Sequence, residues 1–196
     1  DMGAQLSDGT DRLFLTKVDS RGAVVWQRSL GAGGADAMAR GAAVSVDADG
    51  NVTVAGTVSG SFEGTTSDGD MLVARFGADG EEYYATLIRH AGADSARTLA
   101  VGADGTAYVA GRGAGGAGFL ARVDASGHVA EKYSLSENGA VQALAIGADG
   151  NPVALVNNDG VARVLRFDAR ALSDVLGAVS LGTADARALA VAADGT

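Results

Sequence analysis

The chain has 196 residues, a net charge of −9, 30 glycines, one proline and no cysteine. An acidic chain without a basic run argues against a nucleic-acid partner and against an anionic membrane surface, because both attract clustered Lys and Arg. The lack of cysteine excludes disulfides, thiolate metal sites and cysteine nucleophiles. No apolar stretch reaches the roughly 18 residues that a membrane-spanning helix needs.

The expected secondary structure consists of short β-strands, because large and small residues alternate with a period of two. Gly-containing turns separate the strands, and glycine supplies the positive φ angles that tight hairpins require. In chain order, the strands are expected at 13–18, 24–30, 44–46, 52–56, 72–76, 83–88, 99–101, 107–111, 119–123, 129–135, 144–146, 152–156, 162–167, 175–181 and 189–191.

One unit recurs four times along the chain. An Ala-Asp-Gly turn returns with glycine spacings of 55, 45 and 45 residues, and a basic residue followed by an apolar one marks each third strand. Four short antiparallel strands in roughly 45 residues are typical of a propeller blade. We therefore predict an all-β fold, a β-propeller built of four-stranded antiparallel blades, with four blades in this chain. The basic residues are Lys17, Arg75, Arg122 and Arg166.

The two ends of the chain complete each other as parts of one repeat. Placing residue 1 after residue 196 aligns 194–196 and 1–9 with 149–160 without a gap. We expect one propeller domain or propeller segment over 1–196, with repeats at about 1–39 (completed by 186–196), 40–94, 95–139 and 140–185.

Three arrangements of these repeats stay open. The ends could clasp a four-bladed ring, the chain could be part of a larger ring in a longer parent protein, or two copies could join into one ring of about eight blades. The first residue, Asp1, is not an initiator Met and the chain stops just after Asp194-Gly195, which favours the longer parent protein.

The few aromatic residues have fixed places in the repeat. Trp26 and Tyr84 each lie four residues after a turn glycine, and Tyr133 lies two residues beyond the same position in the third repeat. Residues two apart share one face of a strand. We expect one bulky side chain on each of these outer strands to pack between neighbouring blades, and small inner-strand residues to allow close approach near the axis.

With these residues in view, the chain resembles the bacterial β-propeller repeat often called the SBBP repeat. The resemblance rests on LFLTKVDSRGAVVW at 13–26, GAD at 34–36 and VSVDADGNVTVAG at 44–56, and it covers essentially the whole chain. It implies a propeller of a secreted or surface-attached bacterial protein without catalytic activity. The fourth repeat departs most from the pattern, because it has Ala171 in place of the turn glycine and no aromatic residue.

The best metal candidate is the segment Asp47-Ala48-Asp49-Gly50-Asn51, which is similar to the start of an oxygen-ligand calcium loop. The other repeats keep one Asp at this place, and a turn needs only Asp-Gly, so a turn is favoured over a calcium site. We expect no cofactor and no catalytic residues. His90 and His128 are expected on opposite faces of the ring, and the glycine-rich run 111–116 lacks the Lys-Ser/Thr of a phosphate-binding loop.

The candidate binding residues are charged side chains on the variable loop face of the propeller. Acidic and basic residues recur just before the inner strands, where they would form structural ion pairs or a ring of charge around a central opening. The longest loops are expected at 31–40 and 57–70, with acidic tips. The candidates are Asp36, Arg40, Glu63, Asp68, Asp70, Asp94, Arg97, Asp185 and Arg187.

The predicted function is a non-catalytic extracellular or cell-surface propeller of a bacterium that binds a protein or glycan, or further propeller repeats, through its loop face. No signal peptide is visible in this chain. One alternative is a propeller enzyme of the lyase or hydrolase type, with its site in the central channel. Another is a structural decoration or spacer in a surface appendage such as a flagellum or fimbria.

Overall fold

The computed structural model describes residues 11–89 and 92–192, and within these ranges the side chains at 35–36, 114 and 136–138 are not described. The described elements are β-strands and one short 3-10 helix. They are β1 (Leu13–Val18), β2 (Val24–Leu30), β3 (Gly33–Val46), β4 (Val52–Phe62), β5 (Thr65–Phe76), β6 (Glu82–Ile88), β7 (Ser95–Val101), β8 (Ala107–Arg112), η1 (Ala114–Gly116), β9 (Ala117–Val123), β10 (Val129–Asn138), β11 (Ala140–Ile146), β12 (Pro152–Asn158), β13 (Val161–Phe167) and β14 (Val175–Thr183).

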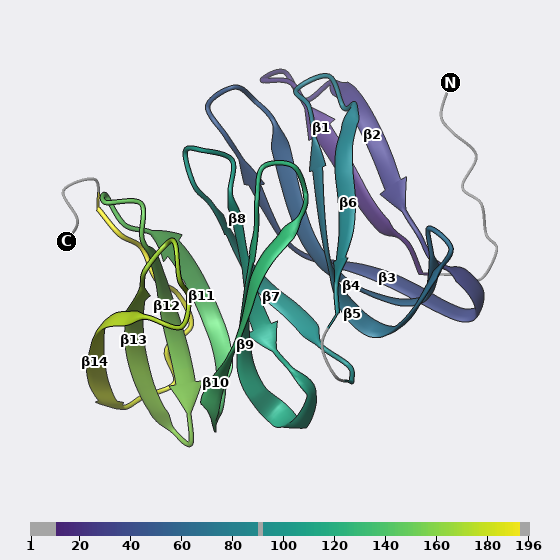
Figure 1. The fold of residues 1–196 in the computed structure, drawn as a ribbon. Helices are drawn as coiled ribbons and strands as arrows, with labels where there is room; N and C mark the ends of the chain where they lie inside the picture. The colour runs from purple at the N-terminus through teal and green to yellow at the C-terminus, as the bar shows by residue number, and fades with distance from the viewer. Residues whose placement is uncertain (1–10, 90–91, 193–196) are drawn as a thin grey trace.

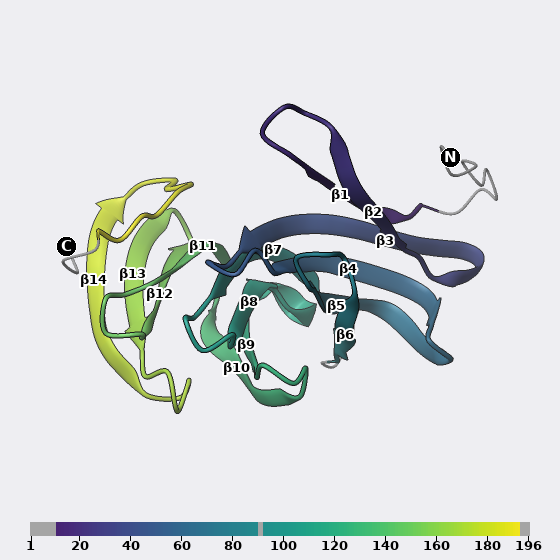
Figure 2. The ribbon, with the colours of Figure 1, turned by 90° about the horizontal axis from the view of Figure 1, so that it is seen from above.

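These strands form a β-propeller with four antiparallel blades, arranged as an open arc (Figures 1 and 2). Blade 1 is the pair β1–β2. Blades 2, 3 and 4 have four strands each, in the orders β3-β4-β5-β6, β7-β8-β9-β10 and β11-β12-β13-β14. The first strands β3, β7 and β11 of consecutive blades lie beside one another, as inner strands around an axis do. The predicted fold class is therefore confirmed.

Apolar side chains between consecutive blades form three separate cores. The first core joins blades 1 and 2, the second joins blades 2 and 3, and the third joins blades 3 and 4. The middle strands β4, β5, β8 and β9 are therefore buried on both faces over most of their length, which explains why their sequences are apolar or small at most of these positions.

The outer-strand aromatic residues pack into these cores as expected. Trp26 of blade 1 lies 6.1 Å from Phe76 of blade 2, ring centroid to ring centroid, and Tyr133 of blade 3 lies 5.8 Å from Phe167 of blade 4. Tyr84 belongs to the core between blades 2 and 3. Each aromatic ring thus contacts the following blade, which ties one blade to the next.

The tight turns follow the sequence pattern closely. Gly50, Gly105 and Gly150 have φ angles of 80–82°, a left-handed conformation that glycine adopts without a steric penalty. The Asp47 carboxylate caps its turn by accepting the backbone N–H groups of Asp49 and Asn51, at 3.0 and 2.9 Å. The Asp-Gly pattern therefore specifies a hairpin turn at each of these places.

Two predicted loops are wrong. The segment 31–40 is mostly part of the 14-residue strand β3, and 57–70 is the end of a long hairpin between β4 and β5. The hairpin turns at Glu63 and Gly64, whose φ angles of 47° and 76° are those of a two-residue type I′ turn. Glycine at position 60 lets the strands approach closely, since a Cβ there would lie 2.8 Å from the carbonyl oxygen of Gly33.

The expected pairing of the two chain ends falls largely outside the described residues, because 1–10 and 193–196 are not described. The described segment 184–192 forms no strand. Figures 1 and 2 both show β1–β2 and β14 at opposite ends of the arc. The repeat boundaries and the clasped ring therefore stay predictions.

Candidate functional site

The most distinctive feature of the loop face is a three-stranded extension of blade 2. We call it the arm; it comprises 33–40 of β3, 57–62 of β4 and 65–70 of β5. Its strands pair from Ala39 with Val58 outward to Phe62 with Thr65. In blades 3 and 4 the corresponding hairpins are shorter, so the arm reaches beyond them (Figure 2).

The arm is a packed structure rather than a loose loop. Ala37, Ala39, Val58 and Phe62 are buried in the core shared with blade 1. The hydroxyl group of Ser67 donates to the carbonyl oxygen of Val58 at 2.6 Å and holds the irregular part of the hairpin. Val58, Gly60 and Phe62 alternate with polar residues, and this period of two is the sequence signal of the strand. The prediction of a loop at 57–70 overlooked this signal.

The three predicted acidic tips divide into two kinds. Glu63 lies exposed at the hairpin turn and Asp68 lies exposed on β5. Asp70 is buried, with its carboxylate 3.6 Å from the guanidinium of Arg89, so its prediction as an exposed tip is wrong. Thr66, Asp68, Asp70, Arg89 and Gly92 surround a polar hollow of about 280 Å³ beside the arm.

Glu63 also affects a carboxylate at the start of β6. Partial burial, and then repulsion from Glu63, raise the pKa of the Glu82 carboxyl above its usual value, while Arg28 acts in the opposite direction. The negative charge of Glu63 therefore acts on Glu82, and the positive charge of Arg28 partly offsets it.

Near the axis, each inner strand has a bulge at the same repeat position. The register shifts between Gly41 and Ala43 in β3, between Ala96 and Thr98 in β7, and between Val141 and Ala143 in β11. A bulge re-aims the side chain of its extra residue. The residues at the bulges are Ala42, Arg97 and Gln142, and Arg187 is the corresponding residue of the fourth repeat.

Two of the bulge residues contact each other across blades. Arg97 donates to the side-chain oxygen of Gln142 at 3.3 Å. The sequence predicts a pairing of Arg97 with Asp94, and this pairing stays a prediction. Asp94 is buried near Gly113, and the described contact of Arg97 is with Gln142. Sequence spacing could not reveal this contact, because the bulge turns Arg97 toward the next blade.

Of the other two predicted ion pairs, Asp36 with Arg40 and Asp185 with Arg187, the structure describes only the second in full. Arg40 forms an ion pair with Asp11 at 3.1 Å, and both side chains are exposed. The side chain of Asp36 lies outside the described part of the structure. Asp185 pairs with Arg187 as expected, and it also accepts a hydrogen bond from the Asn157 side chain at 2.7 Å.

In the segment predicted as a possible calcium loop, the carboxylate of Asp47 accepts hydrogen bonds from other groups of the protein. Besides two backbone N–H groups, Asp47 accepts hydrogen bonds from the Asn51 amide at 2.9 Å and from Arg75 at 2.7 Å. Burial acts to raise the pKa of the Asp47 carboxyl, but the hydrogen bonds and the Arg75 charge outweigh it and hold the pKa below its usual value. Asp47 therefore anchors a turn and an arginine. Among the described residues, no group of three or more metal-ligating side chains is present.

The repeated basic residues on the third strands bridge neighbouring blades. Lys17 donates to the carbonyl oxygens of Gly50 and Ala78, Arg75 donates to that of Gly105, and Arg122 donates to that of Arg170. Arg166, in blade 4, instead pairs with Asp149 of its own blade. Lys17, Arg75 and Arg122 are therefore structural links between blades.

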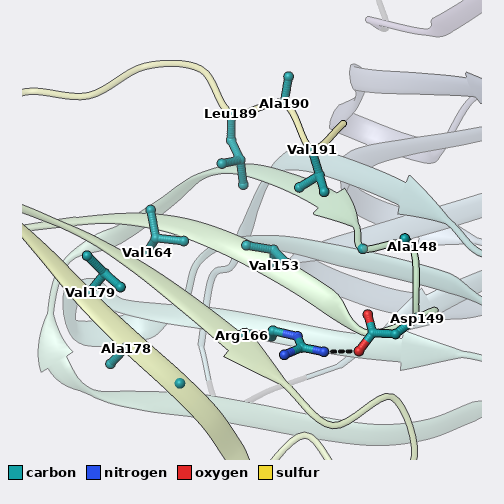
Figure 3. Close-up of a pocket in the computed structure, with 12 residues that line it drawn as sticks. Ala148, Asp149, Val153, Val164, Arg166, Ala178, Val179, Leu189, Ala190 and Val191 are labelled. Atoms are coloured by element: carbon teal, nitrogen blue, oxygen red, sulfur yellow. Dashed lines mark hydrogen bonds and ion pairs between the residues drawn. The ribbon is translucent and has the colours of Figure 1, made fainter. Parts of the chain in front are cut away.

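Two further hollows lie at blade 4. One is polar, about 610 Å³, between the turns of blades 3 and 4, and Tyr108, Arg122, Asn151 and Asp168 are among its lining residues. The other is apolar, about 540 Å³, on the face of blade 4 that points away from blade 3 (Figure 3). The two histidines of the chain are expected on opposite faces of the ring. His128 lies exposed in a turn, and His90 is outside the described residues, so this expectation stays a prediction. No described helix has the length and apolar character needed to cross a bilayer.

The comparisons with known proteins agree with the fold and leave the family open. No family model matches the chain. Regulatory protein FlaEY of Caulobacter vibrioides is 31% identical over 167 residues, which cover 79% of this chain but only 16% of that protein. The chain thus spans a small part of the length of its curated relative.

Two solved structures are similar in fold at 14% sequence identity. A protein of unknown function from Bacteroides caccae has a TM-score of 0.53, with 85% of this chain and 53% of that chain covered. The Dos1 propeller has a TM-score of 0.51, with 86% and 43% covered. Both likenesses concern the propeller fold alone.

Proposed function

We propose that this chain is a non-catalytic propeller module that binds a protein partner through the arm of blade 2. The observation that carries the proposal is the arm itself, a packed and exposed extension that only one of the three four-stranded blades has. A rigid scaffold with one distinctive projection is the usual arrangement of a binding surface. The likeness to a regulatory protein supports a role in binding rather than in chemistry.

The partner surface that fits the arm is basic. Glu63 and Asp68 are exposed on it, and the pKa of Glu82 is raised partly by the charge of Glu63. Arg89, which lines the hollow of the arm, already faces Asp70. Complementary charge across an interface mainly accelerates association and selects the partner.

We further propose that the module works at the bacterial cell surface or outside the cell, as part of a longer polypeptide. The resemblance to the SBBP repeat supports this location. Fractionation of cells that express the parent gene tests it, and recovery of the protein in the cytoplasmic fraction alone would contradict it.

The binding proposal is tested by site-specific crosslinking in the native cells. A photo-crosslinking amino acid at position 68 should give one protein adduct, and the same group at Glu81, exposed in the hairpin turn between β5 and β6, should not. The double variant Glu63→Lys with Asp68→Lys should lose the adduct, while Glu81→Lys keeps it. Equal adducts from positions 68 and 81, or an adduct that survives the double reversal, would refute the arm as the binding surface.

A further inference from the structure

The polar hollow between the turns of blades 3 and 4 lies where the two preceding blade contacts are filled. Lys17 of blade 1 donates to the carbonyl oxygen of Gly50 in blade 2 at 3.1 Å. Arg75 of blade 2 donates to that of Gly105 in blade 3 at 3.2 Å. The corresponding glycine of blade 4 is Gly150, and a Cβ there would meet no described atom within 4 Å. The hollow of about 610 Å³, which Gly150 lines, is therefore a gap in a contact that the other blades close.

A longer turn in blade 4 accounts for this gap. Backbone hydrogen bonds close the turn between the third and fourth strands over 77–81 in blade 2 and over 124–128 in blade 3, but over 168–174 in blade 4. Leu172 of the longer turn is buried in the core between blades 3 and 4. Arg122, the counterpart of Arg75, donates to the carbonyl oxygen of Arg170 in this turn at 3.3 Å. The bridging arginine of blade 3 thus contacts the longer turn and leaves Gly150 uncovered.

Arg122 also lacks the carboxylate partner that its counterpart has. Arg75 donates to the carboxylate of Asp47 at 2.7 Å, whereas blade 3 has Gly102 at the position of Asp47. The carboxylate of Glu131 lies 3.6 Å from the Arg122 guanidinium, which is beyond hydrogen-bond distance. Within the described structure, the Nε atom of Arg122 is buried without a hydrogen-bond partner. Because Arg122 and Gly102 both line the hollow, a carboxylate is missing at its edge.

The rest of the lining suits hydroxyl groups. Asp104 and Asp168 line the hollow together with Thr106 and Asn151. A carboxylate has about four acceptor positions, and a hydroxyl group both donates and accepts hydrogen bonds. The two carboxylates would repel a simple inorganic anion, but they can accept hydrogen bonds from hydroxyl groups. The hollow has a volume within the range of about 300–1,000 Å³ that is usual for small-ligand sites.

We propose that this hollow binds a sugar acid. The ligand carboxylate takes the place that Asp47 has in blade 2 and pairs with Arg122, and the ligand hydroxyl groups donate to Asp104 and Asp168. The site lies at the end of the strands that carries the Asp-Gly turns, whereas the arm extends from the other end. It is therefore a second site, independent of the proposed protein-binding arm.

Calorimetric titration of the full chain with three small probes tests the ligand class. The probes are glucuronate, which carries a carboxylate and hydroxyl groups, glucose, which lacks the carboxylate, and acetate, which lacks the hydroxyl groups. We expect saturable binding of glucuronate, and binding of glucose and of acetate that is weaker by about tenfold or more, because each lacks one set of hydrogen bonds.

A substitution that fills the hollow tests the place of binding. Gly102→Asp gives the turn of blade 3 the same four residues, Asp-Ala-Asp-Gly, as the turn of blade 2. The added Cβ would lie 2.8 Å from Oδ1 of Asp104, the far end of a side chain that can turn away. The new carboxylate should pair with Arg122, weaken glucuronate binding by about tenfold or more, and leave the free energy of unfolding unchanged or higher.

Two further variants complete the test. Gly177→Asp adds the same charge on β14, where a Cβ would meet no described atom within 4 Å, and should leave glucuronate binding unchanged. Arg122→Met removes the guanidinium and should abolish binding, with circular dichroism as the check that this variant is folded.

Each other outcome overturns the proposal. Glucose or acetate that binds as tightly as glucuronate would show that the hollow does not recognise a sugar acid. No saturable binding of glucuronate in the millimolar range would contradict the site itself. Glucuronate binding that persists in folded Arg122→Met or Gly102→Asp chains would place the ligand elsewhere on the molecule.

Discussion

The contact between blades 2 and 3 and the face of blade 4 that points away from blade 3 are built from the same repeat, yet the first is a packed core and the second is exposed along β14. Between blades 2 and 3, Tyr84 packs over the turn glycine Gly127, and Arg75 reaches the carbonyl oxygen of Gly105. In blade 4, Gly177 pairs with Arg166 as Tyr84 pairs with Arg75 in blade 2. Arg166 turns back to Asp149 of its own blade.

This difference shows where the stability of a repeat protein lies. A blade cannot bury its own faces, and it gains its stability from the blade beside it. Substitutions at matched repeat positions therefore measure how much each contact between blades contributes, and the four predictions below run from the largest expected effect to the smallest.

The largest effect is expected from removing a buried phenylalanine between blades. Phe119 is 1% exposed, while Phe14, at the same position in blade 1, is 64% exposed. Phe119→Ala should lower the free energy of unfolding by about 3–5 kcal/mol. Phe14→Ala should change it by less than about 0.5 kcal/mol, because the side chain is exposed. Urea denaturation measures both, and equal losses would contradict the exposure of Phe14.

The next effect concerns a turn glycine covered by a neighbouring blade. A Cβ at Gly127 would lie 2.5 Å from the Tyr84 ring, whereas a Cβ at Gly22 would meet nothing within 4 Å. Both residues have positive φ angles, 90° and 82°, so each alanine substitution costs about 1 kcal/mol of strain. The clash at Gly127 should bring the loss there to about 2–3 kcal/mol. Thermal unfolding midpoints measure the two losses. Equal midpoints for the Gly127→Ala and Gly22→Ala variants would show that the Tyr84 ring moves aside without cost.

A smaller effect is expected from the bridging arginines. Arg75→Met removes the hydrogen bonds to Gly105 and to Asp47 from a side chain that is largely buried, and should cost about 2 kcal/mol. Arg166→Met removes an exposed ion pair within blade 4 and should cost less than about 1 kcal/mol. Chemical denaturation of the two variants in parallel measures both losses. A larger loss of unfolding free energy for Arg166→Met than for Arg75→Met would contradict the view that the contact between blades contributes more than the contact within blade 4.

The smallest effect is a pH dependence at Asp47. Because its pKa is lower in the folded chain than the usual value of 3.8, the ionised carboxylate stabilises the fold at pH values above that range. This stabilisation is lost as the pH falls through the lowered pKa. Asp47→Asn should therefore be less stable than the natural chain at neutral pH, by about 1 kcal/mol, and the difference should shrink below about pH 4. A constant difference down to acid pH would exclude the carboxylate as its source.

The arm shows why part of the candidate site escaped prediction. The segment 57–70 contains polar and glycine residues that read as a loop, although Val58 and Phe62 alternate on one face. Strand formation there depends on burial against Ala37 and Ala39, which come from another part of the chain. For the same reason Asp70 could not be recognised as buried, since its partner Arg89 follows a different strand.

The sequence alone determined the repeat, most of the strands outside the arm, the Asp-Gly turns and the places of the aromatic residues. These features depend on local periodicity and on glycine conformations, which neighbouring residues along the chain encode. Only the tertiary structure decided which charged residues meet, where the arm projects and which apolar faces remain open. Those properties depend on contacts between blades, such as Arg97 with Gln142, whose residues lie 45 positions apart.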